Sequence, residues 1–242
     1  MAGGQPSRPR ASRVVAGMVS AALALAAAAC STATSQPRPG ETGPPARTSA
    51  GTCAPPPVAP STYPTFATPP PASVALGAEW SAVLHTTCGD VSLVLDGKRA
   101  PRSVASFVTL ARSGYWSPSV CHRLTSAPAP TAFLQCGDPT GRSTAEPGYG
   151  LPLENVPADR TYRVGDVGVA RGDGFPSTSG EFFIVHHAFT VASGSPVYSL
   201  IGRVTSGLAV VEHVAAVGGE DFRDDGPPWQ SISILRIDVR PR

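Results

Sequence analysis

The sequence has little charge and lacks the short motifs of the common enzyme classes. Charged residues make up 15% of the 242 residues, the formal net charge is +2, and arginine is scattered along the chain, so nothing points to a nucleic-acid partner. There is no Cys-x-x-Cys, Gly-x-Ser-x-Gly or His-Glu-x-x-His motif, which argues against common zinc or redox sites, serine hydrolases and metalloproteases. His186 and His187 are adjacent but have no third ligand at a useful spacing. The sequence therefore predicts no metal ion and no other cofactor.

A targeting segment is expected at the N-terminus. Three arginines precede a small apolar run at 14–29, which has about the length of a signal-peptide core and is short for a membrane span. The run ends in small residues directly before Cys30, an order that resembles a bacterial lipoprotein cleavage site, although Ala27 stands where such sites usually have leucine. We therefore expect a signal peptide at 1–29 and a lipid on Cys30, which would anchor the chain to the outer face of the cell membrane. Ordinary secretion after an Ala-x-Ala site is the alternative.

A proline-rich segment follows. Between Gln36 and Pro71 the sequence is dominated by proline, serine, threonine, glycine and alanine, with few large apolar residues to offset the entropy of ordering the backbone. We expect residues 30–72 to form a disordered, partly polyproline-like linker. Residues 73–242 then form one domain, which is long enough to bury a hydrophobic core.

Apart from Cys30, the chain has four cysteines, at positions 53, 88, 121 and 136. An even number of cysteines in an exported chain indicates two disulfides, for which three connectivities are possible. Reduced, buried thiols are the alternative.

The folded part shows the pattern of a small β protein. Alternating apolar residues at 81–86 and 91–95, joined by a turn, predict a β-hairpin. Proline at the start and glycine at the end bound a predicted helix at 101–114, and a second helix is expected at about 208–216. A last alternating strand spans 231–239. Many short strands with two helices suggest an antiparallel barrel closed by helices at its ends.

Three short segments carry the chemistry. The segment 121–125 (Cys-His-Arg-Leu-Thr) offers a guanidinium on an apolar strand, 133–138 (Phe-Leu-Gln-Cys-Gly-Asp) offers a neutral amide, and 180–185 (Gly-Glu-Phe-Phe-Ile-Val) offers two phenylalanines. In this order the segments resemble the active face of the cyclophilins, which are peptidyl-prolyl cis-trans isomerases, and the resemblance extends from about Ala78 to the C-terminus. It implies a mainly β fold: a closed barrel of eight antiparallel strands capped by two α-helices.

The resemblance implies three catalytic residues. Rotation about a peptide bond must break amide resonance, and a catalyst has to hold the twisted amide better than either planar form. Arg123 would donate to the prolyl nitrogen, which regains a lone pair when the amide twists. Gln135 would donate to the substrate carbonyl, and Phe183 would form the wall of an apolar slot for the proline ring. Phe182 would face the core.

Five further residues are expected to bind substrate. They are Phe133, Ala170, Arg171, Glu181 and Tyr198. Several depart from the family pattern: Glu181 replaces the glutamine before the Phe-Phe pair, and its charge would change which peptides are favoured and could pair with Arg123. By contrast, His122 is expected to be a structural strand histidine, and the pair at 224–225 a solvated turn.

The resemblance also implies how the cysteines pair. Cys121 and Cys136 would lie nearly opposite each other on the two arms of a hairpin. Cys53 would then pair with Cys88 and pin the end of the linker to the domain.

The predicted function is therefore that of a monomeric, tethered isomerase that acts on X-Pro bonds of proteins folding outside the cytoplasmic membrane. Its partners would be proline-containing polypeptides, and it would contact the membrane through a lipid anchor only. A non-catalytic module that binds proline peptides, or a chaperone on the same scaffold, is the alternative; an envelope protein with a vestigial groove is a third possibility.

Overall fold

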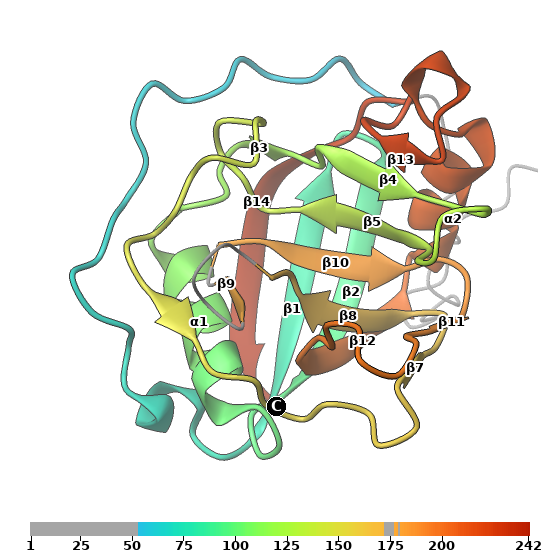
Figure 1. Ribbon diagram of the computed structural model, residues 1–242. Coiled ribbons are helices and arrows are strands. Elements are labelled where there is room, and N and C mark those ends of the chain that lie inside the picture. Colours follow the sequence, from blue (N-terminus) through green and yellow to red (C-terminus); the bar gives the residue numbers. More distant parts are fainter. Residues whose placement is uncertain (1–52, 172–176, 179) are drawn as a thin grey trace, which may run out of the picture. The chain divides into compact units, whose positions relative to one another are not determined.

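The computed structural model of the chain describes residues 53–171, 177, 178 and 180–242, so that the expected signal peptide and Cys30 lie outside the described residues. Ten antiparallel strands form one curled sheet (Figure 1). In their order across the sheet they are β13 (Asp225–Gly226), β4 (Arg123–Thr125), β5 (Phe133–Cys136), β10 (Phe182–Val185), β8 (Asp166–Val169), β12 (Leu200–Ser206), β2 (Gly89–Asp96), β1 (Glu79–Thr86), β14 (Ser233–Pro241) and β3 (Ser119–Val120). Two strand pairs lie outside this sheet: β6 (Gly150–Leu151) with β9 (Ser177–Thr178), and β7 (Thr161–Tyr162) with β11 (Phe189–Thr190).

The mainly β fold with two α-helices is thus confirmed. The sheet has ten strands where eight were expected, because the two-residue strands β3 and β13 extend its two ends. A single bridge between Val120 and Asp138 joins β3 to the residues that follow β5.

The predicted hairpin is formed by β1 and β2, which pair along their whole length. In β1, every second residue from Trp80 to Thr86 is buried, and the residues between are exposed or half-buried. Such a period of two places one face of the strand on the core. β14 covers the expected last strand but begins two residues later, at Ser233.

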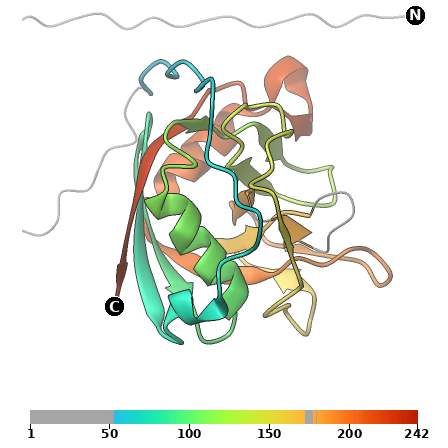
Figure 2. The same ribbon diagram turned by 90° about the vertical axis from the view of Figure 1, so that its left-hand side faces the viewer.

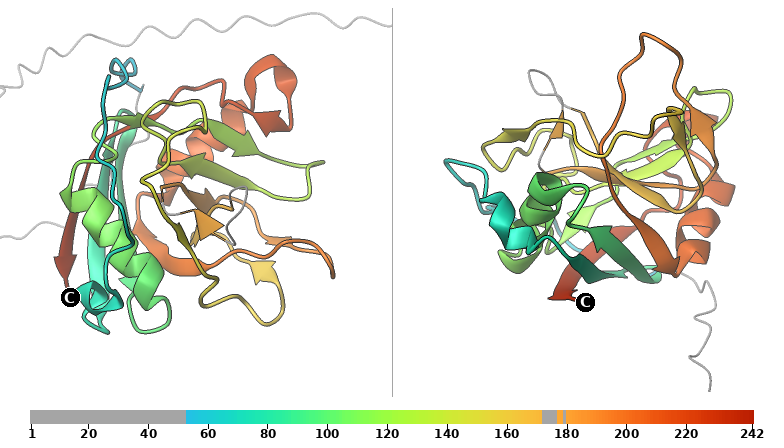
Figure 3. Two further views of the ribbon diagram at one scale, coloured as in Figure 1. Left: turned by 60° about the vertical axis from the view of Figure 1, so that its left-hand side comes forward. Right: turned by 90° about the horizontal axis from the view of Figure 1, so that it is seen from below.

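The two α-helices begin where the sequence predicts. α1 (Pro101–Arg112) has proline in its first turn, where the missing N–H costs no helical hydrogen bond, and Gly114 follows its end with a φ of 74°. α2 (Leu208–Val217) buries Val210, Val211 and Val214. The two helices lie at opposite ends of the curled sheet (Figures 1 and 3).

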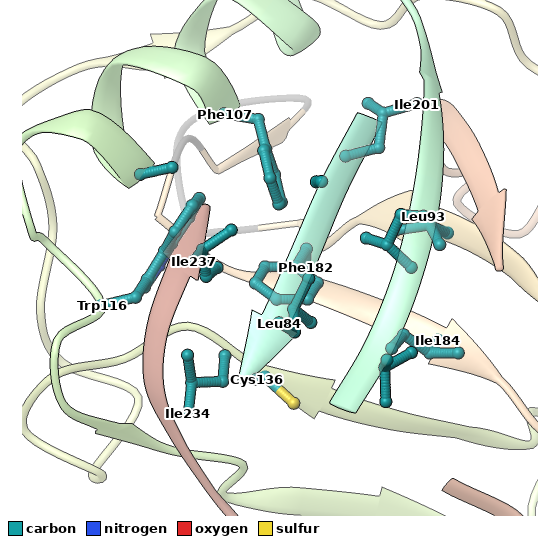
Figure 4. Packing of buried hydrophobic residues seen from close by; sticks show 14 of the residues in the cluster. Leu84, Leu93, Phe107, Trp116, Cys136, Phe182, Ile184, Ile201, Ile234 and Ile237 are labelled. Carbon is teal, nitrogen blue, oxygen red and sulfur yellow. The ribbon is translucent and has the colours of Figure 1, made fainter. Parts of the chain in front are cut away.

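The main hydrophobic core is formed by the sheet together with buried residues of both α1 and α2. Figure 4 shows Phe107 from α1 and Trp116 packed toward Phe182 from β10. The rings of Phe107 and Phe182 are 5.4 Å apart, and those of Trp116 and Phe182 are 5.3 Å apart. Phe182 therefore faces the core, as expected.

Both disulfides pair as the resemblance implied. Cys121 is bonded to Cys136, and Cys53 is bonded to Cys88. The first bridge lies beside the strands that carry Arg123 and Gln135, whereas the second ties the start of the described chain to the turn between β1 and β2.

Residues 53–71, which we call the strap, belong to the segment expected to form a disordered, partly polyproline-like linker, and they contact the folded domain. The strap passes around the outside of the sheet and α1 to the short 3₁₀ helix η1 (Ala72–Ala75) (Figures 1 and 2). Beyond its disulfide, it is held by the T-shaped contact of Tyr63 with Tyr115, with ring centroids 5.7 Å apart. The Phe66 N–H also donates to the Pro147 carbonyl over 2.6 Å. These contacts offset the entropy of ordering a proline-rich segment that has few apolar residues.

None of the helices in the described ranges is long and apolar enough to span a bilayer.

Candidate active site

The three predicted catalytic residues lie in one row across neighbouring strands. Arg123 on β4 is opposite Gln135 on β5, and Gln135 is opposite Phe183 on β10. Gly168 on β8 continues the row opposite Phe183. Because directly opposed residues of antiparallel strands point to the same face, the row brings a guanidinium, an amide and a phenyl ring together.

This row lies on the sheet face opposite the main core. Phe182 belongs to the main core, whereas Phe183 belongs to a second, smaller cluster. We call this second group the aromatic cluster. Its buried members are Ala132, Phe133, Tyr162, Phe183, Val185, Phe189 and Val191, with Tyr198 and Leu200 partly buried against them.

Arg123 is bound by a carboxylate from β13. Its Nε and Nη2 atoms donate to the two Asp225 carboxylate oxygens, each over 2.7 Å. This bond raises the pKa of Arg123, against the opposing effect of burial, and holds the pKa of Asp225 below its usual value. The guanidinium carbon also lies 5.5 Å from the centre of the Phe133 ring. Asp225 is exposed, as expected, but the prediction of a turn is wrong for it, because strand pairing between β13 and β4 places it beside Arg123.

Gln135 joins Arg123 to a buried carboxylate. Its Oε1 accepts a long hydrogen bond of 3.5 Å from Arg123 Nη1, and its Nε2 donates to Glu181 Oε2 over 2.7 Å. Glu181 is 8% exposed and also accepts a 2.8 Å hydrogen bond from the Ser143 hydroxyl. An ionised carboxylate accepts hydrogen bonds but cannot donate them, so the amide nitrogen of Gln135, and not its oxygen, faces Glu181.

His122 completes this polar group behind the row. Its Nε2 lies 3.3 Å from Gln135 Nε2 and 3.7 Å from Glu181 Oε1. Its Nδ1 is buried and has no hydrogen-bond partner among the residues described. The His122 side chain is thus buried against Gln135 and Glu181, and its structural role stays a prediction.

Phe183 is fully buried by its aromatic neighbours. Its ring centre lies 4.7 Å from that of Phe133 and 5.2 Å from that of Tyr198. On its other side the ring lies against Gly168, where a Cβ atom would collide with it. The ring that is predicted to form the wall of an apolar slot is thus covered by other rings.

The other predicted binding residues lie nearby to different degrees. Phe133 and Tyr198 contact Phe183, as described above. Ala170 is buried, and its N–H donates to the Glu181 carbonyl over 3.0 Å, so that it contacts the site through its backbone. Arg171 is exposed, and its Nη1 donates to the Val197 carbonyl, next to Tyr198.

Three further residues shape this face, and no pattern in the sequence predicts them. Asp225 binds Arg123, Ser143 binds Glu181, and Tyr162 packs in the aromatic cluster while its hydroxyl donates to the Tyr198 carbonyl over 2.9 Å. Each is far from its partner in the sequence, and no local motif marks them. In the ranges that the structure describes, no three histidine, cysteine, aspartate or glutamate side chains are grouped so as to hold a metal ion.

Comparison with known proteins agrees with this geometry. Residues 82–239 match the family model of the cyclophilin type peptidyl-prolyl cis-trans isomerases. The probable peptidyl-prolyl cis-trans isomerase B of Mycobacterium tuberculosis is 31% identical over 173 residues, which cover 66% of this chain and 54% of the relative. The protein of the same name from Mycobacterium leprae is 32% identical over 173 residues, with 65% of this chain and 57% of the relative covered. The chain therefore spans little more than half the length of these curated relatives.

A solved structure shares the fold. A cyclophilin type peptidyl-prolyl cis-trans isomerase from Cryptosporidium parvum, crystallised in the presence of the dipeptide Ala-Pro, superposes with a TM-score of 0.55 at 22% sequence identity. The match covers 67% of this chain and 99% of that one.

Proposed function

The chain belongs to the cyclophilin type peptidyl-prolyl cis-trans isomerase family, and from this premise we propose that it accelerates rotation about X-Pro bonds in polypeptides. The observation that carries the proposal is the row of Arg123, Gln135 and Phe183 across β4, β5 and β10. The row places one permanent charge and one amide at the edge of an aromatic cluster, and this reaction needs neither a metal nor a nucleophile.

Arg123 is the residue to which we assign the main catalytic effect. The barrier to peptide rotation is about 18–20 kcal/mol, since the planar amide is stabilised by resonance. When the bond twists, the prolyl nitrogen regains a lone pair that can accept a hydrogen bond. Of the five guanidinium N–H groups, two donate to Asp225 and one to Gln135, so two are left for the substrate. Asp225 fixes the direction in which they point.

Phe183 and Gln135 would hold the substrate on either side of the twisted bond. The Phe183 ring offers an apolar surface for proline, and an apolar surround strengthens the field of the neighbouring guanidinium. Tyr198 is only half-buried, and we propose that it moves aside when proline binds. Gln135 would then orient the carbonyl that precedes proline.

We propose an extracytoplasmic location for this activity. The apolar run at 14–29 and the following Cys30 support export and lipidation. Two disulfides in the described part of the chain support an oxidising compartment. The substrates would then be exported polypeptides that fold near the membrane. A diacylglyceryl group on Cys30, detected by mass spectrometry of the mature protein, would establish the anchor, and an unmodified N-terminus at another residue would exclude it.

A second candidate function is binding of proline peptides without turnover. It is favoured by the complete burial of Phe183 and by the bond that holds the Gln135 amide nitrogen on Glu181. A groove in which proline enters only after the Tyr198 ring moves would bind weakly. A Gln135 amide nitrogen turned away from the substrate would contribute little to rotation of the X-Pro bond.

Exchange NMR of a short Ala-Pro peptide distinguishes the two. We expect the wild-type protein to accelerate isomerisation, and Arg123→Ala to reduce the acceleration at least tenfold, equivalent to about 1.4 kcal/mol of barrier. Arg123→Lys should also be impaired, because lysine keeps the charge but loses the planar array of donors. Arg236→Ala, which changes an exposed arginine on β14, is the matched control. Changes in the NMR chemical shifts of the peptide, without faster isomerisation, would instead support binding without turnover.

A further inference from the structure

Two large aromatic side chains are exposed on the loop between α2 and β14. Phe222 is 99% exposed and Trp229 is 61% exposed. Their rings are stacked on each other, with centroids 6.4 Å apart and an interplanar angle of 25°. We call residues 219–229 the aromatic–acidic loop. It includes the 3₁₀ turn η2 (Glu220–Phe222) and the edge strand β13.

Backbone hydrogen bonds hold this loop in a defined conformation. The Glu220 N–H donates to the Pro227 carbonyl over 2.8 Å, and the Trp229 N–H donates to the Gly218 carbonyl over 2.9 Å. Asp221 and Phe222 have φ values of 55° and 58°, in the left-handed region that costs a residue other than glycine about 1 kcal/mol or more. The rings are therefore exposed by a closed, hydrogen-bonded loop and not by a free chain end.

The loop also carries excess negative charge. Between 219 and 229 there are four carboxylates, at 220, 221, 224 and 225, and one guanidinium, that of Arg223. Asp225 is bound to Arg123. Asp221 lies 4.0 Å from the Arg223 guanidinium, and Glu220 is exposed beside Asp221 and Phe222 in the sequence. The four carboxylates still exceed the one guanidinium of the loop. Aromatic faces and carboxylates together favour a cation, because the ring faces carry partial negative charge.

The position of the loop relative to the catalytic row is fixed by β13. Asp225 pairs with Thr125, and Gly226 pairs with Leu124, on the strand that bears Arg123. The Ser126 N–H donates to the Asp224 carbonyl over 2.8 Å, which extends this contact. β13 is the end strand of the sheet (Figure 1). A substrate polypeptide that is bound at Arg123 and extends across β4 and β13 therefore reaches the aromatic–acidic loop.

We propose that the aromatic–acidic loop binds lysine and arginine side chains of the polypeptide whose proline lies at Arg123, so that the protein prefers proline sites with basic flanks. The inference rests on the proposed function, since it assigns the substrate class of the same site. The negative charge of the loop favours a basic polypeptide over a bilayer surface, because anionic lipids repel carboxylates.

Three peptides test the preference. Each peptide has twelve residues and one central Ala-Pro bond. Four flanking positions are all lysine in the first peptide, all glutamine in the second and all glutamate in the third. Binding to the full-length protein is measured by titration at 50 mM and 500 mM NaCl. We expect the lysine peptide to bind about fivefold more tightly than the glutamine peptide at low salt, with the glutamate peptide weakest. The difference should shrink at high salt, because ions screen exposed charges.

Two sets of variants connect the preference to the loop. In Phe222→Ser/Trp229→Ser, and separately in Glu220→Gln/Asp221→Asn/Asp224→Asn, the ratio of the lysine and glutamine dissociation constants should fall to near one. Val58→Ser, which changes an apolar side chain on the strap that is 92% exposed, should keep the ratio. Circular dichroism shows whether each variant is folded. If the aromatic variant does not fold, the result for the charge variant alone tests the proposal.

The outcomes separate this inference from the proposed function. Isomerisation of the glutamine peptide without any lysine preference would overturn the inference and leave the isomerase. A loop-dependent lysine preference without isomerisation of any peptide would support the basic-side-chain site and overturn the isomerase. If the loop variants instead abolish a dimer seen in sedimentation, or abolish binding to phosphatidylglycerol vesicles, while the wild type binds all three peptides alike, the loop serves that contact and the proposal is wrong.

Discussion

At the scale of single residues, Glu181 is the departure from the family pattern with the clearest chemical effect. Its carboxylate lies behind Gln135 and takes the amide nitrogen that would otherwise serve the substrate. The predicted pairing of Glu181 with Arg123 is replaced by the bonds to Gln135 and Ser143, and Arg123 is bound by Asp225. Two residues of the row, Arg123 and Gln135, thus lie between two carboxylates in a chain of hydrogen bonds that runs from Asp225 to Glu181.

Glu181→Gln is therefore expected to increase activity. A hydrogen bond to a neutral amide is about half as strong as one to a carboxylate, so Gln135 would turn more readily toward a substrate carbonyl. We expect kcat/KM for an Ala-Pro peptide to rise about threefold, measured by exchange NMR. Ser143→Ala removes a second bond to the same carboxylate without neutralising it, and it should give no increase. An unchanged or lower kcat/KM in Glu181→Gln would show that Gln135 acts in the orientation seen here.

The residues of the row could be predicted from the sequence because each lies in a short segment of recognisable composition. Their partners could not. Arg123 and Asp225 are 102 positions apart, and Gln135 and Glu181 are 46 apart. A pairing across such distances depends on strand register, which one sequence does not encode locally. The same applies to the covered state of Phe183, which depends on where the Tyr198 ring lies.

At the scale of elements, the loop after β5 links the catalytic row to a buried carboxylate. Asp138 is fully buried and accepts hydrogen bonds from the Thr140 hydroxyl over 2.7 Å and from the Thr144 N–H over 2.6 Å. Burial acts to raise the pKa of Asp138, but these bonds outweigh it and hold the pKa below its usual value. The same loop presents Ser143, with a φ of 56°, to Glu181.

Asp138→Asn is expected to destabilise the protein by about 2 kcal/mol at pH 7, since several charge-assisted bonds are weakened together. Because the folded pKa is lower than the unfolded one, the unfolded state takes up the proton first, and this stabilisation is lost as the pH falls below about 3.9. The difference in unfolding free energy between wild type and variant should therefore shrink between pH 7 and pH 3 in urea titrations. Asp159→Asn, at an exposed carboxylate, should have a much smaller effect at pH 7. A difference that does not change with pH would contradict the assignment to the charge of Asp138.

Long elements with a clear period were the predictable ones. The hairpin of β1 and β2, both α-helices and β14 follow from alternation, from proline at a helix start and from glycine at a helix end. Two-residue strands such as β3 and β13 are too short to show a period. They are strands only because a neighbour pairs with them. The residues of β13 therefore resemble a solvated turn in the sequence, although Asp225 binds Arg123 in the structure.

At the scale of the whole molecule, the strap and the active face are joined to the sheet by separate disulfides. The bridge between Cys53 and Cys88 closes 35 residues of chain, and that between Cys121 and Cys136 closes 15. Composition predicts a proline-rich linker for the strap, because proline, serine and alanine offer little to bury. What composition cannot show is that one disulfide, the rings of Tyr63 and Phe66 and two backbone hydrogen bonds attach it to the domain.

Removing each disulfide should therefore have a different consequence. Cys53→Ala/Cys88→Ala should lower the unfolding free energy by about 4 kcal/mol and Cys121→Ala/Cys136→Ala by about 3 kcal/mol, since loop-closure entropy grows with loop length. The first variant should be cleaved by chymotrypsin after Phe66, whereas Tyr63 is protected by the proline that follows it. Its isomerase rate should stay within about twofold of wild type, because the strap is held by Tyr115, Tyr149 and Pro147. The second should keep its strap intact but lose activity, since Cys136 directly follows Gln135. Loss of activity in the first variant, with the fold retained by circular dichroism, would show that the strap supports the active face and is not a separate attachment.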